Sequence, residues 1–487
     1  MRSYLYALVA ALVCAAAQAD AEVLAVVGGT IIDGNGGTPI ENGVVIIDGK
    51  RIVAVGDRST PIPARAKKIA ATGKFIIPGL METGAYLVGD YEPVDTLIRY
   101  EGRYDELAIE GAQMALKGGV TTLVGIWGPR DDLIKAREAI NQGRVPAARL
   151  YFSGNIVGYD GPMSVDFIGD DAGVGIETFE PAVSRKFMDR VNARFTQDVG
   201  SELTLLEPEE IRQRIHNYAT SGIDFVALGI SAHRPWAFQY SVFAPSVQQL
   251  IVQETHRAGL LAVGFSANSN RTINEALGAG VDLIYYCDTT LTGKALPAAT
   301  IALLAQRQIP CAISPNTSTA EAFYRQQIHD GGPLLSYIES MALNDRALIS
   351  SGAMTLMATN GGLYGRDTFA TWQTRGIAMS DGQTLKVLGS SHYWWLMAAQ
   401  EKGMTPMAAL LSATRNVARA FKLDKDLGTL ERGKLADLVV LDKNPLERAE
   451  NYRSVSLVVK EGRVIDRDAL PTQKLLTAAA PSNPDKR

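Results

Sequence analysis

The sequence is poor in the side chains that bind transition metals. Its 487 residues include only five histidines and three cysteines. No two histidines are spaced as His-x-His and no two cysteines as Cys-x-x-Cys, so the sequence contains neither of these common zinc-binding motifs. Lysine and arginine total 48, against 52 aspartates and glutamates, and they form no basic run. This balance argues against a nucleic-acid-binding protein, which needs a basic face.

The N-terminus has the pattern of an export signal. Arg2 precedes an apolar stretch from Leu5 to Ala17, and Ala17-Gln-Ala19 provides the small residues of a cleavage site. The stretch is shorter than the ~18 residues that a membrane-spanning helix needs. We therefore predict a signal peptide over residues 1–19 and a mature protein that is periplasmic or secreted, with no membrane attachment.

Two cysteines, Cys287 and Cys311, remain after this cleavage. They are too few for a disulfide framework. One bridge would form if their strands were neighbours, but the expectation is two buried free thiols.

Both ends of the mature chain have the short alternating pattern of antiparallel strands. One hairpin is predicted with its turn at Asp48-Gly-Lys-Arg51, and another with its turn at Lys460-Glu-Gly-Arg463. We expect the two ends, residues 20–74 and 421–470, to form one small β-sandwich. Residues 471–487 are predicted to be a disordered tail.

The middle of the chain alternates strands and helices, which predicts parallel β-α units. Eight strands are expected, at Phe75–Leu80, Thr121–Ile126, Arg149–Ser153, Asp224–Leu228, Leu261–Phe265, Leu283–Tyr286, Pro310–Ser314 and Met354–Ala358. Eight such units close as a (β/α)8 barrel, so the predicted fold class is α/β, with a barrel over residues 75–420 beside the small β-sandwich.

Two segments interrupt the alternation, residues 155–207 and 320–348. We expect them to lie over the carboxyl ends of the barrel strands as loops or a lid. A structural insertion without a function is an equal alternative.

Motifs at both ends of the barrel region resemble those of the amidohydrolase superfamily. The first runs from Val44 to Gly56 and continues with Pro78-Gly-Leu80, and the second comprises Ala413-Thr-Arg-Asn416 and the stretch from Leu427 to Asp442. The sequence is most similar to the branch of the imidazolonepropionases and Xaa-Pro dipeptidases. This resemblance implies the same barrel and sandwich, and association with further subunits.

The resemblance also implies where a divalent metal would be bound. Superfamily members place histidines, a carboxylated lysine and an aspartate at the ends of the barrel strands. The matching positions of this chain hold Gly84, Tyr86, Ala227, Phe265, Tyr286 and Asn360. None of these is a usual metal ligand, so we predict a protein without a metal or other cofactor. A relocated metal site is the alternative.

The replaced positions suggest an aromatic pocket for a small ligand. The candidate ligand-binding residues are Tyr86, Phe265, Tyr285, Tyr286, Asn360 and Trp394. The candidate catalytic residues are Glu82, Tyr86 and Tyr286. The alternative is that these side chains only fill the space that metal and water occupy in relatives. Asn316 and Thr317 are assigned to an ordinary turn, His392 is a lone acid–base candidate, and the absence of a Gly-x-Ser-x-Gly motif gives no support for serine catalysis.

Two functions follow from these observations. The first is an exported, non-hydrolytic protein that binds a small molecule or a short peptide, or that acts as the partner of a second copy or of an active relative. The second is a metal-independent enzyme, a hydrolase of C–N bonds, a lyase or an isomerase, with tyrosine and carboxylate groups as acid and base.

Overall fold

The computed structural model describes residues 23–88, 94–164, 185–232, 241–290, 293–327, 333–364, 373–374, 379, 383–384 and 386–477. The predicted signal peptide, residues 1–19, lies outside the described residues. None of the helices in the described part of the chain is both long enough and apolar enough to span a membrane.

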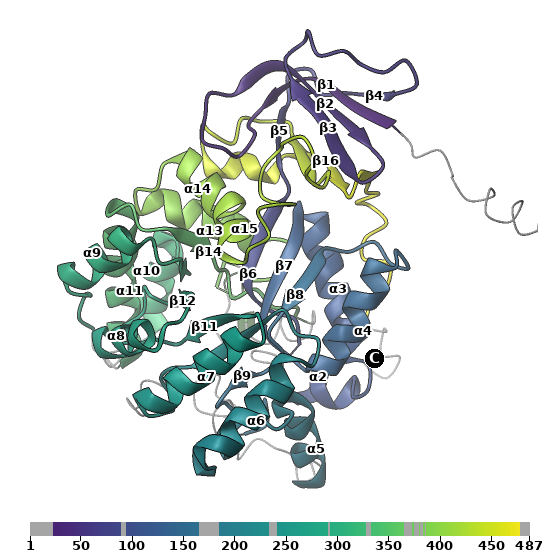
Figure 1. Ribbon diagram of the computed structural model, residues 1–487. Coiled ribbons are helices and arrows are strands. Elements are labelled where there is room, and N and C mark those ends of the chain that lie inside the picture. The colour runs from purple at the N-terminus through teal and green to yellow at the C-terminus, as the bar shows by residue number, and fades with distance from the viewer. Residues whose placement is uncertain are drawn as a thin grey trace, which may run out of the picture.

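The two ends of the chain meet in one eight-stranded sheet, at the top of Figure 1. Its strands are β1 (Val23–Ile31), β2 (Ile40–Asp48), β3 (Arg51–Gly56), β4 (Lys67–Ala70), β5 (Phe75–Pro78), β15 (Leu438–Leu441), β16 (Val455–Lys460) and β17 (Arg463–Val464). The order is β17-β16-β15-β5-β1-β2-β3, and β4 pairs with β1. One hydrogen-bonded sheet thus contains both ends of the chain, and its folding into a two-layered sandwich stays a prediction. Because β5 pairs with β1 on one side and with β15 on the other, the ends join edge to edge.

Both predicted hairpins are confirmed. Asp48 pairs with Arg51 in the first, and Lys460 pairs with Arg463 in the second. Gly462 in the second turn has a φ of +73°, and a Cβ there would lie 1.8 Å from the carbonyl oxygen of Gly49. The two turns therefore touch, and only glycine allows this approach.

The barrel region contains two parallel sheets. The first is β6 (Leu80–Tyr86), β7 (Val120–Trp127) and β8 (Arg149–Phe152), and the second is β9 (Ile156–Val157), β10 (Phe225–Gly229), β11 (Leu261–Phe265), β12 (Leu283–Tyr285), β13 (Cys311–Ile313) and β14 (Thr355–Met357). Every residue of these strands is buried except Tyr151. Their near-continuous apolar character fits parallel strands that are covered on both faces.

The first predicted barrel strand is displaced along the chain. Residues Phe75–Pro78 belong to the small sheet as β5, and the chain enters the barrel region only at Leu80. A Cβ on the intervening Gly79 would lie 2.2 Å from the hydroxyl of Thr121. The change of sheet thus passes through a contact that only glycine allows, and Glu82, Gly84 and Tyr86 lie within β6 rather than after it.

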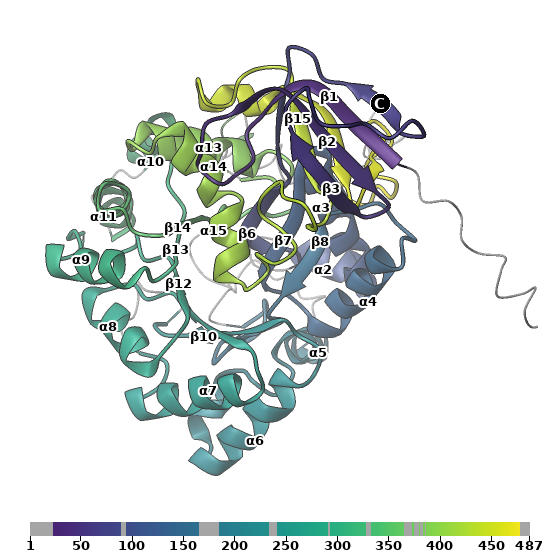
Figure 2. The ribbon, with the colours of Figure 1, turned by 45° about the horizontal axis from the view of Figure 1, so that its top comes forward.

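The outer strands of the two parallel sheets are joined by backbone contacts. Thr83 in β6 forms a parallel bridge with Ala358, directly after β14. The N–H of Asp224, just before β10, donates to the carbonyl of Phe152 in β8 at 3.0 Å. The strands surround a common centre in Figure 2, with the helices outside them. The body is therefore α/β and TIM-barrel-like, and we call the carboxyl ends of its strands the mouth.

Helices follow most of the strands, as the alternation predicts. They are α2 (Val94–Arg99), α3 (Tyr104–Lys117), α4 (Arg130–Asn141), α5 (Arg185–Thr196), α6 (Pro208–Ala219), α7 (Pro245–Arg257), α8 (Asn270–Ala279), α9 (Ala298–Arg307), α10 (Ser318–Gln327), α11 (Pro333–Ser350), α13 (Ser391–Glu401), α14 (Pro406–Ser412) and α15 (Arg415–Ala420). The predicted excursion over residues 320–348 is largely helical, because α10 and α11 occupy it. Of the excursion over 155–207, the described part holds β9, α5 and a short 3-10 helix (Ser201–Leu205).

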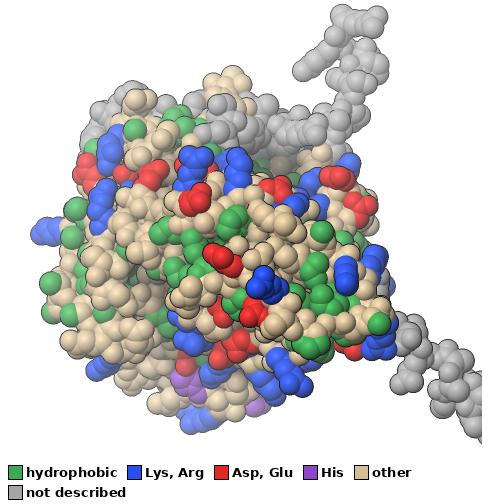
Figure 3. All heavy atoms as spheres, turned by 90° about the horizontal axis from the view of Figure 1, so that it is seen from above, with side chains coloured by type: hydrophobic (Ala, Val, Ile, Leu, Met, Phe, Trp, Pro, Cys, Tyr) green, Lys and Arg blue, Asp and Glu red, His purple; other side chains and the backbone are tan. Residues whose placement is uncertain are grey.

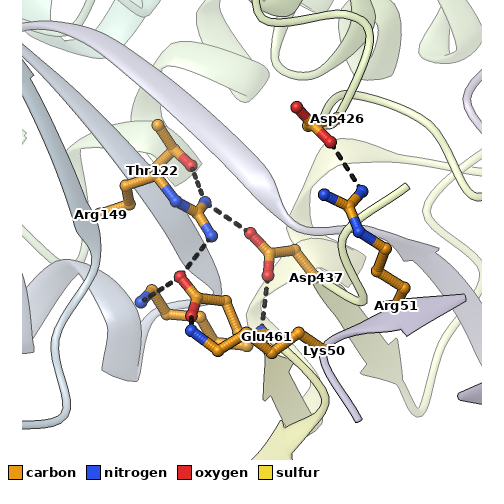
Figure 4. A network of polar contacts seen from close by, with 8 residues as sticks. Lys50, Arg51, Thr122, Arg149, Asp426, Asp437 and Glu461 are labelled. Atoms are coloured by element: carbon orange, nitrogen blue, oxygen red, sulfur yellow. Dashed lines mark hydrogen bonds and ion pairs between the residues drawn. The ribbon is translucent and has the colours of Figure 1, made fainter. Parts of the chain in front are cut away.

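An ionic network joins the small sheet to the amino end of β8 (Figure 4). The guanidinium of Arg149 donates to Asp437 and to Glu461, each at 2.8 Å, and to the hydroxyl of Thr122 at 3.1 Å. Arg149 is 7% exposed. Nearby, Arg51 pairs with Asp426 on the surface at 2.7 Å.

The prediction of a disordered tail over residues 471–487 is wrong for its first seven residues, 471–477. The carboxylate of buried Glu110 in α3 accepts backbone N–H bonds from Leu475, Leu476 and Thr477 at 2.9–3.0 Å. The side chain of Leu476 is 7% exposed. Residues 471–477 therefore pack against α3, because a buried carboxylate needs these donors. Residues 478–487 lie outside the described part of the chain.

The expectation of two free thiols is also wrong, because Cys287 and Cys311 form a disulfide with a Cα–Cα distance of 5.8 Å. Ile284 and Cys311 are partners in the β12–β13 register, and Cys287 lies just after the end of β12, so the disulfide links two neighbouring strand segments. This is the condition under which the sequence allowed a bridge.

Candidate functional site

Four aromatic side chains occupy the centre of the mouth. Tyr86, Phe265, Tyr285 and Tyr286, which we call the aromatic cluster, are at most 8% exposed. The ring of Phe265 contacts that of Tyr286 edge to face at a centroid distance of 5.2 Å, and the rings of Tyr285 and Tyr286 are 6.2 Å apart. These distances are typical of packed aromatic pairs, so the cluster fills the space between the strand ends.

A chain of hydrogen bonds crosses the cluster. The hydroxyl of Tyr286 donates to Oδ1 of Asn360 at 2.5 Å. Its oxygen also lies 3.0 Å from the hydroxyl oxygen of Tyr86. Because a phenol has a single proton, Tyr86 must be the donor in this second bond. The side chains at three of the six replaced metal-ligand positions thus form hydrogen bonds with one another.

The backbone at the strand ends is unusual. Ser266, Tyr286 and Asn360 have φ values of +56°, +63° and +55°. Left-handed backbone costs a residue other than glycine about 1–3 kcal/mol and is concentrated at functional sites. Gly84 has a φ of +71°, and a Cβ there would lie 3.2 Å from the Tyr285 ring. An imidazole at position 84 would therefore collide with the aromatic cluster.

The donor set at these positions does not fit a divalent metal. Two phenols and one amide are the polar groups among the six side chains, whereas zinc and its neighbours prefer imidazole, thiolate and carboxylate ligands. Among the described residues, no group of three or more His, Cys, Asp and Glu side chains is placed to hold an ion. His216 and His256 pair with Glu254 and Asp282 on the helical layer, and His233 and His329 lie outside the described residues.

Glu82 is enclosed beside the cluster. It is 0% exposed, and its Oε1 accepts hydrogen bonds from the hydroxyls of Thr359 and Ser391. Its Oε2 has no hydrogen-bond partner among the described residues. Burial raises the pKa of Glu82 to about 7 against these two hydrogen bonds, so the carboxyl is half protonated near neutral pH.

His392 lies next to Glu82 and is also 0% exposed. Its Nε2 is 3.1 Å from the carbonyl of Gly118, which can only accept, so Nε2 carries the proton. The free Nδ1 is 4.0 Å from Glu82 Oε2. Burial lowers the pKa of His392 to about 3. The pair is therefore a neutral imidazole that faces a carboxyl group.

A small pocket adjoins the filled centre; its cavity volume is about 10 Å³, and the surrounding space reaches about 270 Å³ only when open solvent is counted. It lies where β13, β14 and α13 meet. Its polar walls include Ser314, Asn316, Thr317, Thr359, Lys386 and Ser391, and its apolar walls include Trp394 and Trp395. Thr359 and Ser391 separate the pocket from Glu82, which therefore lies one side chain behind the wall.

The structure divides the sequence-predicted site residues into two groups. Trp394 lines the pocket, whereas the aromatic cluster and Asn360 lie in the filled centre. Asn316 and Thr317, which the sequence assigned to an ordinary turn, line the pocket as well. Thr317 still has the expected turn role, because its hydroxyl accepts the N–H of Ala320 at 3.1 Å. Their position directly after a barrel strand is the signal that could have identified them.

The sequence did not indicate Lys386, which lines the pocket, or the two aspartates whose charges act on it. Lys386 donates from Nζ to the hydroxyl of Ser314 at 2.9 Å. Desolvation by the surrounding protein lowers the pKa of Lys386 to about 8, against the opposing charges of Asp288 and Asp345. Burial raises the pKa of both aspartates, which are 0% exposed. No motif links these residues, which lie far apart in the sequence.

The family model described as "Amidohydrolase family" matches residues 104–465. The chain belongs to the amidohydrolase family. The predicted resemblance is therefore confirmed. Membership of the family does not test whether its metal site has been replaced in this chain. The loss of the metal therefore stays a prediction.

Solved structures of the family support the fold over nearly the whole chain. The chain is 33% identical to molinate hydrolase, with a TM-score of 0.87 over 95% of this chain and 99% of that one. It is 30% identical to phenylurea hydrolase B, with a TM-score of 0.86 over 94% of this chain and 100% of that one. A Xaa-Pro dipeptidase with bound methionine, at 19% identity and a TM-score of 0.69 over 91% and 100%, shows the same fold.

A shorter match connects the chain to a deaminase of Symbiobacterium thermophilum. The 5-methylthioadenosine/S-adenosylhomocysteine deaminase of that organism is 30% identical over 135 residues, which cover 24% of this chain and 31% of the deaminase. The chain thus matches less than a third of that relative.

Proposed function

We propose that this amidohydrolase-family protein binds a small organic molecule, or the end of a short peptide, in the pocket between β13, β14 and α13, without a resident metal ion. The observation that carries the proposal is the filled centre beside an open pocket. Where relatives would hold the metal, Tyr86, Tyr286 and Asn360 bond one another. The open space lies to one side, where polar groups and two tryptophans line it.

The proposal includes a closed (β/α)8 barrel and an exported protein. The bridge between Thr83 and Ala358 and the bond from Asp224 to Phe152 support closure. Export rests on the pattern of residues 1–19. In Figure 3, which looks onto the small sheet, basic and acidic side chains are interspersed over the coloured surface. On this face, such a mixture of charges gives no support for the binding of a nucleic acid.

The pocket lining favours a compact ligand with an amide-like group. The names of the two relatives at 33% and 30% identity state that they hydrolyse molinate and a phenylurea. A phenylurea combines a ring, which the two tryptophans can contact, with N–H and C=O groups for Asn316, Thr317 and Lys386. We therefore take phenylurea as the probe, and not as the natural ligand.

Metal content and binding test this proposal together. Mature protein would be incubated with zinc, manganese or iron, freed of loosely bound ion, and analysed for metal, with phenylurea binding followed by calorimetry. We expect far less than one ion per chain and the same affinity before and after treatment with EDTA. Asn316→Ala should weaken binding about 5- to 10-fold, the effect of one lost hydrogen bond, and Asn217→Ala on α6 should leave it unchanged. Stoichiometric, tightly held metal, or binding that EDTA abolishes, would overturn the proposal.

A metal-independent enzyme is the second candidate. Glu82 supports it, because burial raises its pKa to about 7, in the range that suits a general acid or base. Tyr86 and Tyr286 would supply the hydroxyl donors. Because Glu82, Tyr86 and Tyr286 are all buried, a substrate could reach them only if the pocket wall opened at Thr359 or Ser391.

A further inference from the structure

We propose that Ser314 and Lys386 form a nucleophile and base pair that accepts the acyl group of a small carboxamide or carboxylic ester bound in the pocket. The inference rests on the proposed binding of a small ligand there. It assigns the chemistry to residues outside the filled metal position and outside the candidates Glu82, Tyr86 and Tyr286.

The two side chains come from separate segments of the chain, and each segment is fixed by its own contacts. Ser314 is the first residue after β13, and its N–H donates to Oδ2 of Asp288 at 2.9 Å. Lys386 lies beside a short parallel bridge between Gly362 and Val387. The carbonyl of Lys386 accepts the N–H of Gly362 at 3.2 Å. The separation of 2.9 Å between Lys386 Nζ and Ser314 Oγ is within the reach required of a base and its nucleophile.

The contacts of Lys386 differ from those of a structural cation. No carboxylate among the described residues forms an ion pair with it, and its side chain bonds to the Ser314 hydroxyl instead. Asp288, in the segment after β12, and Asp345 in α11 are the acidic groups that act on it. With a pKa of about 8, roughly a tenth of Lys386 is a neutral amine at pH 7 and half at pH 8. The neutral amine can accept the hydroxyl proton of Ser314.

Two residues that line the pocket with this pair, Trp394 and Asn316, carry N–H donors. Nε1 of Trp394 is buried and has no partner among the described residues, although a buried indole N–H normally finds one. The side-chain amide of Asn316 also lines the pocket. Donors of this kind stabilise the negative oxygen that develops when a nucleophile attacks a carbonyl. Stabilising this oxygen would be the function of the Trp394 indole N–H, which has no hydrogen-bond partner among the described residues.

The reaction is balanced with water as the co-reactant. The amine of Lys386 removes the proton of Ser314 while Oγ bonds to the carbonyl carbon. The C–N or C–O bond of the substrate then breaks, and the leaving amine or alcohol takes the proton from the Lys386 ammonium. Water, deprotonated by Lys386, attacks the acyl-serine, and the C–Oγ bond breaks. Oγ takes the proton back from the Lys386 ammonium as the carboxylic acid leaves, which restores the Ser314 hydroxyl and the neutral amine.

A biotin-linked fluorophosphonate tests the pair on the full mature protein, because it modifies activated serines covalently. We expect labelling of the peptide that contains Ser314, with a rate that rises with pH to a half-maximum near 8. Ser314→Ala should abolish this labelling, and Ser221→Ala should not change it. Lys386→Arg keeps the charge but cannot act as a base, so it should slow labelling at least 100-fold, whereas Lys443→Arg should have no effect.

The results separate this inference from the proposed ligand. Phenylurea binding without labelling of Ser314, in protein with an unchanged melting temperature, would overturn the pair alone. Labelling of Ser314 without phenylurea binding would support the pair and overturn phenylurea as a suitable ligand. Equal labelling rates for the wild type and Lys386→Arg would overturn the role of the lysine as base.

Discussion

The Arg149 network at the amino end of β8 and the mouth differ in how their buried polar groups are hydrogen-bonded. At the amino end of β8, Arg149 has three partners, and they tie it to the small sheet (Figure 4). At the mouth, Oε2 of Glu82 and Nε1 of Trp394 are buried without a partner among the described residues. Buried polar atoms are normally paired, so each exception requires an explanation. The buried charge of Arg149 is thus fully paired, as stability requires, whereas stability does not explain these two atoms at the mouth.

The largest effect is expected from breaking the paired end. Arg149→Met leaves the carboxylates of Asp437 and Glu461 without their shared cation, and removing one partner of a buried ion pair costs about 3–5 kcal/mol. Urea unfolding would measure this loss in the free energy of unfolding. Arg51→Met is the matched control, because its pair with Asp426 is exposed and worth about 0.2–1 kcal/mol. Equal losses in the two variants would show that the network is no stronger than a surface pair.

The next largest effect concerns Glu82 at the mouth. Its pKa is about 7 in the folded protein against an ordinary value of 4.5, so the folded state binds the proton more tightly than the unfolded chain. The free energy of unfolding should therefore fall as the pH rises from 4.5 to 7, by roughly 3 kcal/mol. Glu82→Gln should equal the wild type at pH 4.5 and exceed it at pH 8.

Urea unfolding between pH 4.5 and 8 would measure this difference, with the exposed Glu209→Gln as the control. Parallel pH profiles of Glu82→Gln and the wild type would contradict an elevated pKa of Glu82.

A smaller effect is expected within the aromatic cluster. Tyr286→Phe removes the hydroxyl that donates to the partly buried Oδ1 of Asn360, and the loss of one such hydrogen bond costs about 0.5–1.5 kcal/mol. Tyr452 is a matched control, since it is 1% exposed and its hydroxyl has no partner among the described residues. Tyr452→Phe should change the free energy of unfolding little or increase it. Identical results for the two tyrosines would mean that the hydroxyl chain contributes nothing to stability.

The sequence predicted the parts of the fold that local patterns encode. Apolar runs located the barrel strands, and Asp48-Gly49 and Glu461-Gly462 located the hairpin turns. It failed where the chain changes sheet at Gly79, because both strands there are apolar and only the contact with Thr121 separates them. The disulfide depended on strand neighbours, which periodicity alone does not establish.

The candidate site was predicted less completely for a physical reason. The replaced metal positions could be found because motifs fix them within single strands. Ser314 and Lys386 are 72 residues apart and meet only through the fold, so no spacing indicates their pairing. The left-handed backbone of Tyr286 is equally invisible in the sequence, because tyrosine disfavours this conformation and the surrounding structure imposes it.

The sheet that unites both ends of the chain also has a consequence for biosynthesis. Arg51 and its partner Asp426 are 375 residues apart, so at ~5–20 residues per second a ribosome needs roughly 20 to 75 seconds to deliver the second after the first. Until then β5 lacks β15, and Arg149 lacks both of its carboxylates. A prematurely ended chain would therefore keep an open strand edge and an unpaired buried cation, features that chaperones and proteases act on. Completion of the sheet thus serves as a check that the whole polypeptide has been made.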